Sequence, residues 1–135
     1  MALTLTTHDT GYADPDEPTI AQVLASLDGR RRTLATLGRS ELVYVQASGS
    51  VGAGFSVEYQ EGSLDQHYRS RNGALPLAQT TEIFVRYARG DGGWRDGLDW
   101  ERIYFVQPRT HWSGTWVGFA ALLAIAIAVI WYLRG

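Results

Sequence analysis

An apolar run near the end of the chain constrains the fold most. Every residue but one glycine from Trp116 to Leu133 is hydrophobic, and no charged side chain lies between Arg109 and Arg134. As an α-helix rising ~1.5 Å per residue, this run is about 27 Å long, close to the thickness of the hydrocarbon core of a bilayer. A chain of 135 residues has too little other mass to bury such a helix on every side. We therefore predict a transmembrane helix over residues 113–134.

Aromatic residues mark both ends of the predicted span. Indole and phenol rings concentrate at membrane–water interfaces, so we expect interfacial anchors at Trp112 and Trp116 on one side and at Trp131 and Tyr132 on the other. More arginine precedes the run than follows it, and cytoplasmic segments carry the excess of positive charge. We expect a single-pass, tail-anchored membrane protein whose N-terminal domain lies in the cytoplasm.

Small residues gather on one side of the predicted span. They allow the backbones of neighbouring helices to approach closely, which is how helices gain packing energy in lipid. This side is interpreted as a contact with integral membrane protein subunits, although alanine is also simply tolerated in a lipid anchor. The candidate packing residues are Gly114, Gly118, Ala120, Ala121, Ala124 and Ala128.

Two amphipathic stripes predict two helices before the apolar run. Thr19 and Gln22 form a capping-box pattern that opens the first stripe, and Gly29 is expected to end that helix. The same register can continue through Leu37. Pro76 suits the first turn of the second helix. The inward stripe of the second helix is predicted to be Leu77, Thr80, Ile83, Phe84, Tyr87 and Ala88.

Alternating residues between the two helices predict strands. Hydrophobic and polar residues alternate over 55–60, as in a half-buried antiparallel strand, and β-rich segments occupy 42–47 and 64–71. Residues 103–106 are predicted as either a fourth, edge strand or a short helix. We predict an α+β domain with a small antiparallel sheet of three to four strands and two helices, followed by one C-terminal transmembrane helix. The predicted organisation is a mobile tail over 1–17, the domain over 18–106, a linker over 107–112 and the span over 113–134.

The residues that usually carry chemistry are few. The chain has no cysteine, which excludes thiolate metal sites and thiol nucleophiles. His67 is the best acid–base candidate, and no second histidine lies at ligand spacing. The glycines of 48–54 lack a dinucleotide fingerprint, and the carboxylates of 91–101 lack calcium-loop spacing. We expect no catalytic residues, no cofactor, no metal and no small-molecule substrate, so the chain is not predicted to be an enzyme.

The charge balance argues against a nucleic-acid partner. Lysine and arginine total 12 against 14 aspartates and glutamates, a formal net charge of −2, whereas binding a polyanion requires a concentrated cationic surface. The one basic run, at 30–32, follows Asp28 and is interpreted as a solvated loop. A contact with anionic lipid or an acidic partner is the alternative.

The segment from Trp94 to Trp100 has the composition of a partner contact. Two tryptophans and Arg95 lie on a glycine-rich stretch, and tryptophan and arginine are enriched at the energetic centres of protein interfaces. Both tryptophans can equally fold back and close a small core. The sequence leaves the two interpretations open.

These observations favour a non-catalytic accessory subunit of a larger membrane protein complex. Its soluble domain would brace or dock at the membrane surface, and its partners would be the bilayer and other membrane subunits. The alternative is a membrane-tethered binding or immunity-type protein whose soluble domain captures one soluble partner.

Overall fold

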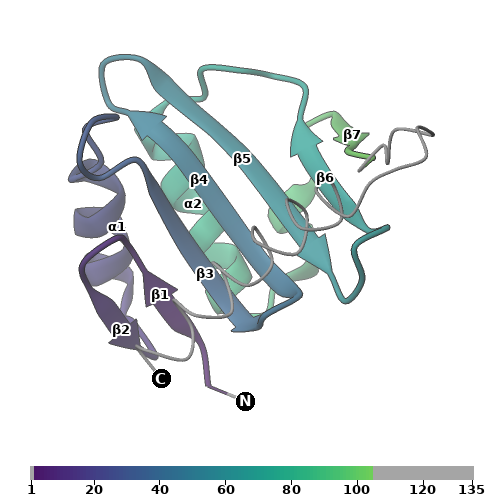
Figure 1. Cartoon of the computed structure of the whole chain (residues 1–135), viewed down its shortest axis with the longest axis horizontal. Coiled ribbons are helices and arrows are strands. Elements are labelled where there is room, and N and C mark those ends of the chain that lie inside the picture. The colour runs from purple at the N-terminus through teal and green to yellow at the C-terminus, as the bar shows by residue number, and fades with distance from the viewer. Residues whose placement is uncertain (1, 105–135) are drawn as a thin grey trace, which may run out of the picture. The chain divides into compact units, whose positions relative to one another are not determined.

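Seven antiparallel strands form one sheet, and both helices pack on the same face of it (Figure 1). The computed structural model describes residues 2–104. Neighbouring strands pair in the order β2-β1-β3-β4-β5-β6-β7, so that β3 to β6 form a meander in the middle of the sheet. The strands are β1 (Thr4–Thr6), β2 (Gly11–Ala13), β3 (Leu34–Ser40), β4 (Val43–Ser50), β5 (Gly54–Glu61), β6 (His67–Ser70) and β7 (Trp100–Arg102).

The first helix, α1 (Glu17–Ala25), connects β2 to β3. Its N-cap is Asp16, whose carboxylate accepts a hydrogen bond from the Thr19 N–H at 2.9 Å. The predicted cap at Thr19 is therefore wrong, because Thr19 already lies in the first turn and its own N–H is the group that needs an acceptor.

The second helix, α2 (Leu77–Ala88), lies between β6 and a short 3₁₀ helix, η1 (Gly92–Arg95). Pro76 stands at the N-cap with extended backbone, one position before the helix begins. The predicted inward stripe is confirmed by burial of its central members. These are Thr80, Ile83, Phe84 and Tyr87.

The hydrophobic core lies between the sheet and the two helices. Along β5 the predicted alternation is confirmed over 55–59, because Phe55, Val57 and Tyr59 point into the core while Glu58 is only half-buried. It fails at Gln60, which is buried as well. In an antiparallel sheet with helices on one side only, every second side chain of a strand faces the helices and is buried. The helix layer contributes Ile20, Leu24, Ile83 and Phe84, and strands β1 and β3 contribute Leu5 and Leu37.

The prediction of a three- to four-stranded sheet is wrong. Residues 1–17, expected to be a mobile tail, contain β1 and β2, and the residues around Leu37 form β3 instead of prolonging the first helix. Leu37 pairs with Leu5 of β1 and with Val45 of β4. Two backbone ladders and complete burial of Leu37 outweigh the weak helical periodicity of this segment. The transmembrane helix of the same prediction lies outside the described residues.

The glycines of 48–54 belong to a tight hairpin between β4 and β5. Only residues 51–53 form the turn, since β4 runs through Ser50 and β5 begins at Gly54. Gly54 has φ +86°, and a Cβ on it would lie 2.5 Å from the Cα of Ala74. A side chain at this position is therefore excluded both by the left-handed backbone and by the close approach of the chain before α2.

Candidate functional site

The three residues predicted as a partner contact lie together at one end of the core. Trp94, in η1, is buried and packs edge-to-face on Tyr59 and Tyr87, with ring centroids 4.9 and 5.4 Å apart. Trp100, in β7, is half-buried and packs edge-to-face on Tyr59, with ring centroids 4.8 Å apart. Its indole N–H donates to the Arg95 carbonyl at 3.0 Å. Both tryptophans thus close the core, as one of the two interpretations held.

Arg95 covers this aromatic cluster from outside. Its guanidinium lies 5.4 Å from the centre of the Tyr59 ring and 5.2 Å from that of Trp94. The same group forms an ion pair with Glu61 at 2.8 Å, and both side chains remain more than a third exposed. Burial of the Tyr59 ring raises the pKa of its hydroxyl, although Arg95 opposes this shift. We call Tyr59, Glu61, Trp94 and Arg95 the Arg95 cluster.

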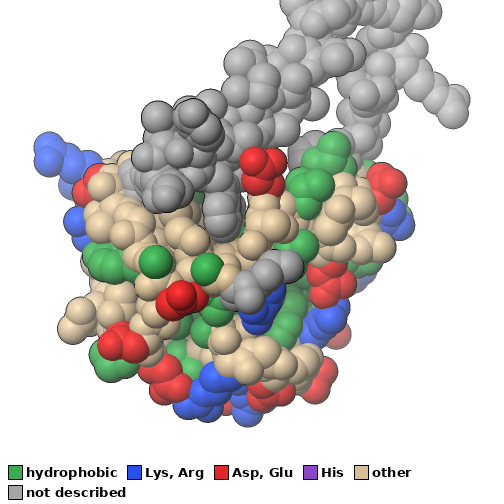
Figure 2. Space-filling model, turned by 90° about the horizontal axis from the view of Figure 1, so that it is seen from below, with side chains coloured by type: hydrophobic (Ala, Val, Ile, Leu, Met, Phe, Trp, Pro, Cys, Tyr) green, Lys and Arg blue, Asp and Glu red, His purple; other side chains and the backbone are tan. Residues whose placement is uncertain are grey.

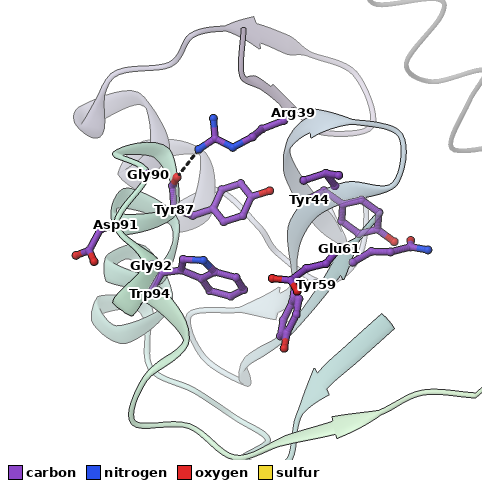
Figure 3. Close-up of a pocket in the computed structure, with 11 residues that line it drawn as sticks. Arg39, Tyr44, Tyr59, Glu61, Tyr87, Gly90, Asp91, Gly92 and Trp94 are labelled. Atoms are coloured by element: carbon purple, nitrogen blue, oxygen red, sulfur yellow. Dashed lines mark hydrogen bonds between the residues drawn. The ribbon is translucent and has the colours of Figure 1, made fainter. Parts of the chain in front are cut away.

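A cavity of about 180 Å³ lies beside the Arg95 cluster, between the C-terminal end of α2 and the ends of β3, β4 and β5 (Figure 3). Its volume is below the ~300–1,000 Å³ typical of small-molecule sites. Figure 3 shows the Tyr87 ring between Arg39 and Trp94, with its hydroxyl directed across the cavity toward the strands that carry Tyr44 and Glu61. Glycines 90 and 92 and Asp91 complete the wall on the helix side.

Arg39 and Tyr87 are held together by two contacts. The Arg39 guanidinium donates to the Tyr87 carbonyl at 3.0 Å and lies 5.3 Å from the centre of the Tyr87 ring. Burial raises the pKa of the Tyr87 hydroxyl, and the nearby Arg39 charge counteracts this shift. The Arg39 guanidinium also approaches the hydroxyl as a donor, which lowers this pKa, but no hydrogen bond of proper geometry forms at the buried oxygen. The sequence pattern predicts Tyr87 only as a core residue and carries no signal that singles out Arg39.

The predicted acid–base candidate, His67, lies on the opposite face of the sheet. Its Nε2 atom is 3.2 Å from a carboxylate oxygen of Glu58, which belongs to the neighbouring strand. A histidine–carboxylate pair can hold and transfer a proton, but this pair lies on the sheet face opposite the helices, and neither residue lines the cavity. Residues 2–104 hold no group of three or more histidine, aspartate or glutamate side chains placed to bind a metal ion.

The carboxylates of 91–101 do not converge. Asp91 caps η1 by accepting the Gly93 N–H at 2.9 Å, and Glu101 pairs with Arg69 of β6 at 2.8 Å. Asp91 and Glu101 therefore each have a structural partner of their own. On the face of the molecule that Figure 2 shows, acidic and basic side chains are interspersed.

The membrane predictions concern residues beyond the described part of the chain. The anchors Trp112, Trp116, Trp131 and Tyr132 lie there, as do the small residues from Gly114 to Ala128. Among residues 2–104, neither helix has the length and apolar character needed to cross a bilayer. Comparison with known protein families, with curated proteins and with solved structures finds no match for this chain.

Proposed function

We propose that this chain is a non-catalytic, single-pass membrane protein whose α+β domain docks on a protein partner, as an accessory subunit of a larger membrane complex. The Arg95 cluster is the observation that carries the proposal. A half-exposed arginine stacked on buried aromatic rings is a preorganised contact, because the rings already fix the guanidinium before a partner arrives. Arginine, tryptophan and tyrosine are also the side chains that dominate binding energy at protein interfaces.

The size of the neighbouring cavity supports a protein partner over a small-molecule ligand. About 180 Å³ is the space of roughly six water molecules, at ~30 Å³ each. That space suits one side chain of a partner, inserted as an anchor beside the Arg95 cluster. A metabolite would be left largely outside it.

The membrane part of the proposal rests on the sequence. The uncharged run from Trp116 to Leu133 has the length and the aromatic flanks of a span. Its small-residue side, which includes Gly114 and Gly118, is what contact with other membrane helices would use. We propose a membrane location with the domain in the cytoplasm.

A second candidate is a tethered protein whose domain captures one soluble partner, as an immunity-type protein does. The observation that favours it is that the Arg95 cluster and the cavity belong entirely to the α+β domain. Docking through them requires nothing from the span. In this case the apolar run is only an anchor.

Replacing residues 116–133 by an unrelated poly-leucine anchor separates the two candidates. Partners are then identified by co-purification from native membranes. A membrane complex that is lost on anchor replacement supports the accessory subunit, whereas a partner that is retained supports the tether. An Arg95→Ala variant should lose the partner in both cases, and Arg30→Ala, which removes an exposed arginine elsewhere, should keep it. A partner that Arg95→Ala retains would contradict the docking surface itself.

A further inference from the structure

The cavity contains a buried hydroxyl with no partner. Tyr87 is 7% exposed, and its hydroxyl oxygen is buried without a hydrogen bond. The hydroxyl loses its water on folding and keeps only the approach of Arg39 in return. A buried hydroxyl without a hydrogen bond of proper geometry is unusual in native proteins. Because the hydroxyl points into the cavity (Figure 3), an occupant of the cavity is placed to satisfy it.

The cavity also contains a cation that lacks a carboxylate. Two other arginines stand nearby, and each has an acidic partner: Arg95 pairs with Glu61, and Arg86 pairs with Glu82. Within residues 2–104, Arg39 forms no ion pair, and one of its guanidinium nitrogens donates to a neutral carbonyl. A guanidinium has five N–H donors, so Arg39 keeps donors available for the cavity.

These two groups define the chemistry of an occupant. A phenolic hydroxyl and a guanidinium both donate hydrogen bonds, so the matching group is an acceptor, and the positive charge favours an anionic one. A cation is disfavoured because the aromatic faces that would attract it already carry arginines. Arg39 lies over Tyr87, and Arg95 lies over Tyr59 and Trp94. The cavity wall carries two carboxylates, and both already have partners: Glu61 pairs with Arg95, while Asp91 accepts the Gly93 N–H and lies 4.0 Å from the Arg86 guanidinium.

We propose that the cavity receives the carboxylate of one glutamate or aspartate side chain of the protein partner, paired with Arg39 and hydrogen-bonded by the Tyr87 hydroxyl. The inference rests on the proposed docking function and names the partner residue that this function uses. The carboxylate would form an ion pair with Arg39, which has no acidic partner within residues 2–104. The methylene groups would lie against Trp94 and Tyr59, whose rings form the apolar wall.

The test uses blocked peptides and the full chain in detergent micelles. The probe is acetyl-Ala-Glu-Ala-amide, and the matched control is acetyl-Ala-Gln-Ala-amide at equal ionic strength. Binding is followed by NMR of the arginine Nε–H groups and the tyrosine rings. We expect saturable shifts at Arg39 and Tyr87 with the glutamate peptide in the millimolar range, as for a single side chain. The glutamine peptide should bind at least about fivefold more weakly.

Two variants assign the effect to the named groups. Tyr87→Phe removes only the hydroxyl and should weaken the glutamate peptide about fivefold, the loss expected for one hydrogen bond. Because that hydroxyl has no partner in the free protein, Tyr87→Phe should not lower Tm. Arg39→Gln should weaken binding at least tenfold. The matched controls, Tyr12→Phe and Arg30→Gln, alter exposed residues outside the cavity and should leave binding unchanged.

Three results would overturn the inference. They are equal shifts with both peptides, shifts produced instead by methylguanidinium, and unchanged peptide binding in Tyr87→Phe with a lowered Tm. The last would mean that the hydroxyl already has an internal partner. None of these outcomes depends on whether a membrane complex is recovered, so failure of the carboxylate site is distinguishable from failure of the proposed function.

Discussion

The guanidinium of Arg39 donates to the carbonyl of Tyr87 at 3.0 Å and lies over its ring at 5.3 Å. This contact joins β3 to the last turn of α2. The last carbonyls of a helix have no partner within it. The Tyr87 carbonyl accepts the Gly90 N–H at 3.1 Å, and the arginine from the sheet is a further donor to it. The cavity is therefore framed by a rigid link between the two layers of the domain.

Truncation of Trp94 should be severely destabilising. The side chain is 7% exposed and contacts Tyr59 and Tyr87 edge-to-face. We expect Trp94→Ala to lower the free energy of unfolding by ~3–5 kcal/mol, the usual cost of removing a large buried aromatic. Chemical denaturation of the full chain in detergent micelles, followed by near-UV circular dichroism, measures it. Leu64→Ala, at a side chain 55% exposed, should change stability by less than ~0.5 kcal/mol.

Two glycines of the β4–β5 hairpin should differ sharply in how much stability is lost when each is replaced by alanine. Gly54→Ala places a Cβ 2.5 Å from the Ala74 Cα on a backbone with φ +86°, and we expect a loss of roughly 2 kcal/mol or more. Gly52→Ala has no atom within 4 Å of the added Cβ and should be nearly neutral. Thermal denaturation of the two variants in parallel decides the matter. Similar melting temperatures would show that β5 does not approach Ala74 so closely.

Asp28 should contribute stability that depends on pH. Its carboxylate accepts the backbone N–H groups of Arg30, Arg31 and Arg32 at 2.8, 3.0 and 3.1 Å. These bonds, that of Arg30 foremost, hold the pKa of the carboxyl below its usual value. Because folding lowers this pKa, the contribution is present above the unfolded value of ~3.9 and is lost as the pH falls through the folded pKa.

The variant Asp28→Ala should therefore have a lower Tm than the parent at neutral pH, and the difference should shrink below about pH 4. Asp28→Asn keeps an acceptor oxygen but cannot titrate. The difference in Tm between the parent and Asp28→Asn should therefore also depend on pH and shrink in the acid range. Melting curves across the acid range test both. A Tm deficit of Asp28→Ala that does not vary with pH would mean that the ionised carboxylate is not what stabilises the loop.

Local patterns were sufficient for the central elements of the fold. The alternation of Phe55, Val57 and Tyr59 specifies a strand, and the stripe through Ile83 and Phe84 specifies a helix, because both patterns are long enough to repeat. Strands β1, β2 and β7 have three residues each, which is too short for an alternation to be recognised. Pairing with the neighbouring strands, and not their own sequence, makes them strands.

The cavity has no local signal in the sequence. Arg39 and Tyr87 lie 48 positions apart, and each has an ordinary explanation on its own element, as a polar strand residue and as a core helix residue. The proximity of Trp94, Arg95 and Trp100 is easier to predict from the sequence, because the three residues share one short segment. That the tryptophans face inward while Arg95 covers them follows only from the position of Tyr59 on β5.

The size of the particle extracted from native membranes tests the proposed function most directly. After gentle detergent extraction, we expect the chain to sediment and elute as part of an assembly much larger than itself, and we expect Arg95→Ala to shift it toward the free form. The control Arg30→Ala should elute with the parent. A chain that elutes alone, as monomer or dimer, or that appears in the soluble fraction without detergent, would contradict the proposal of a membrane-held accessory subunit.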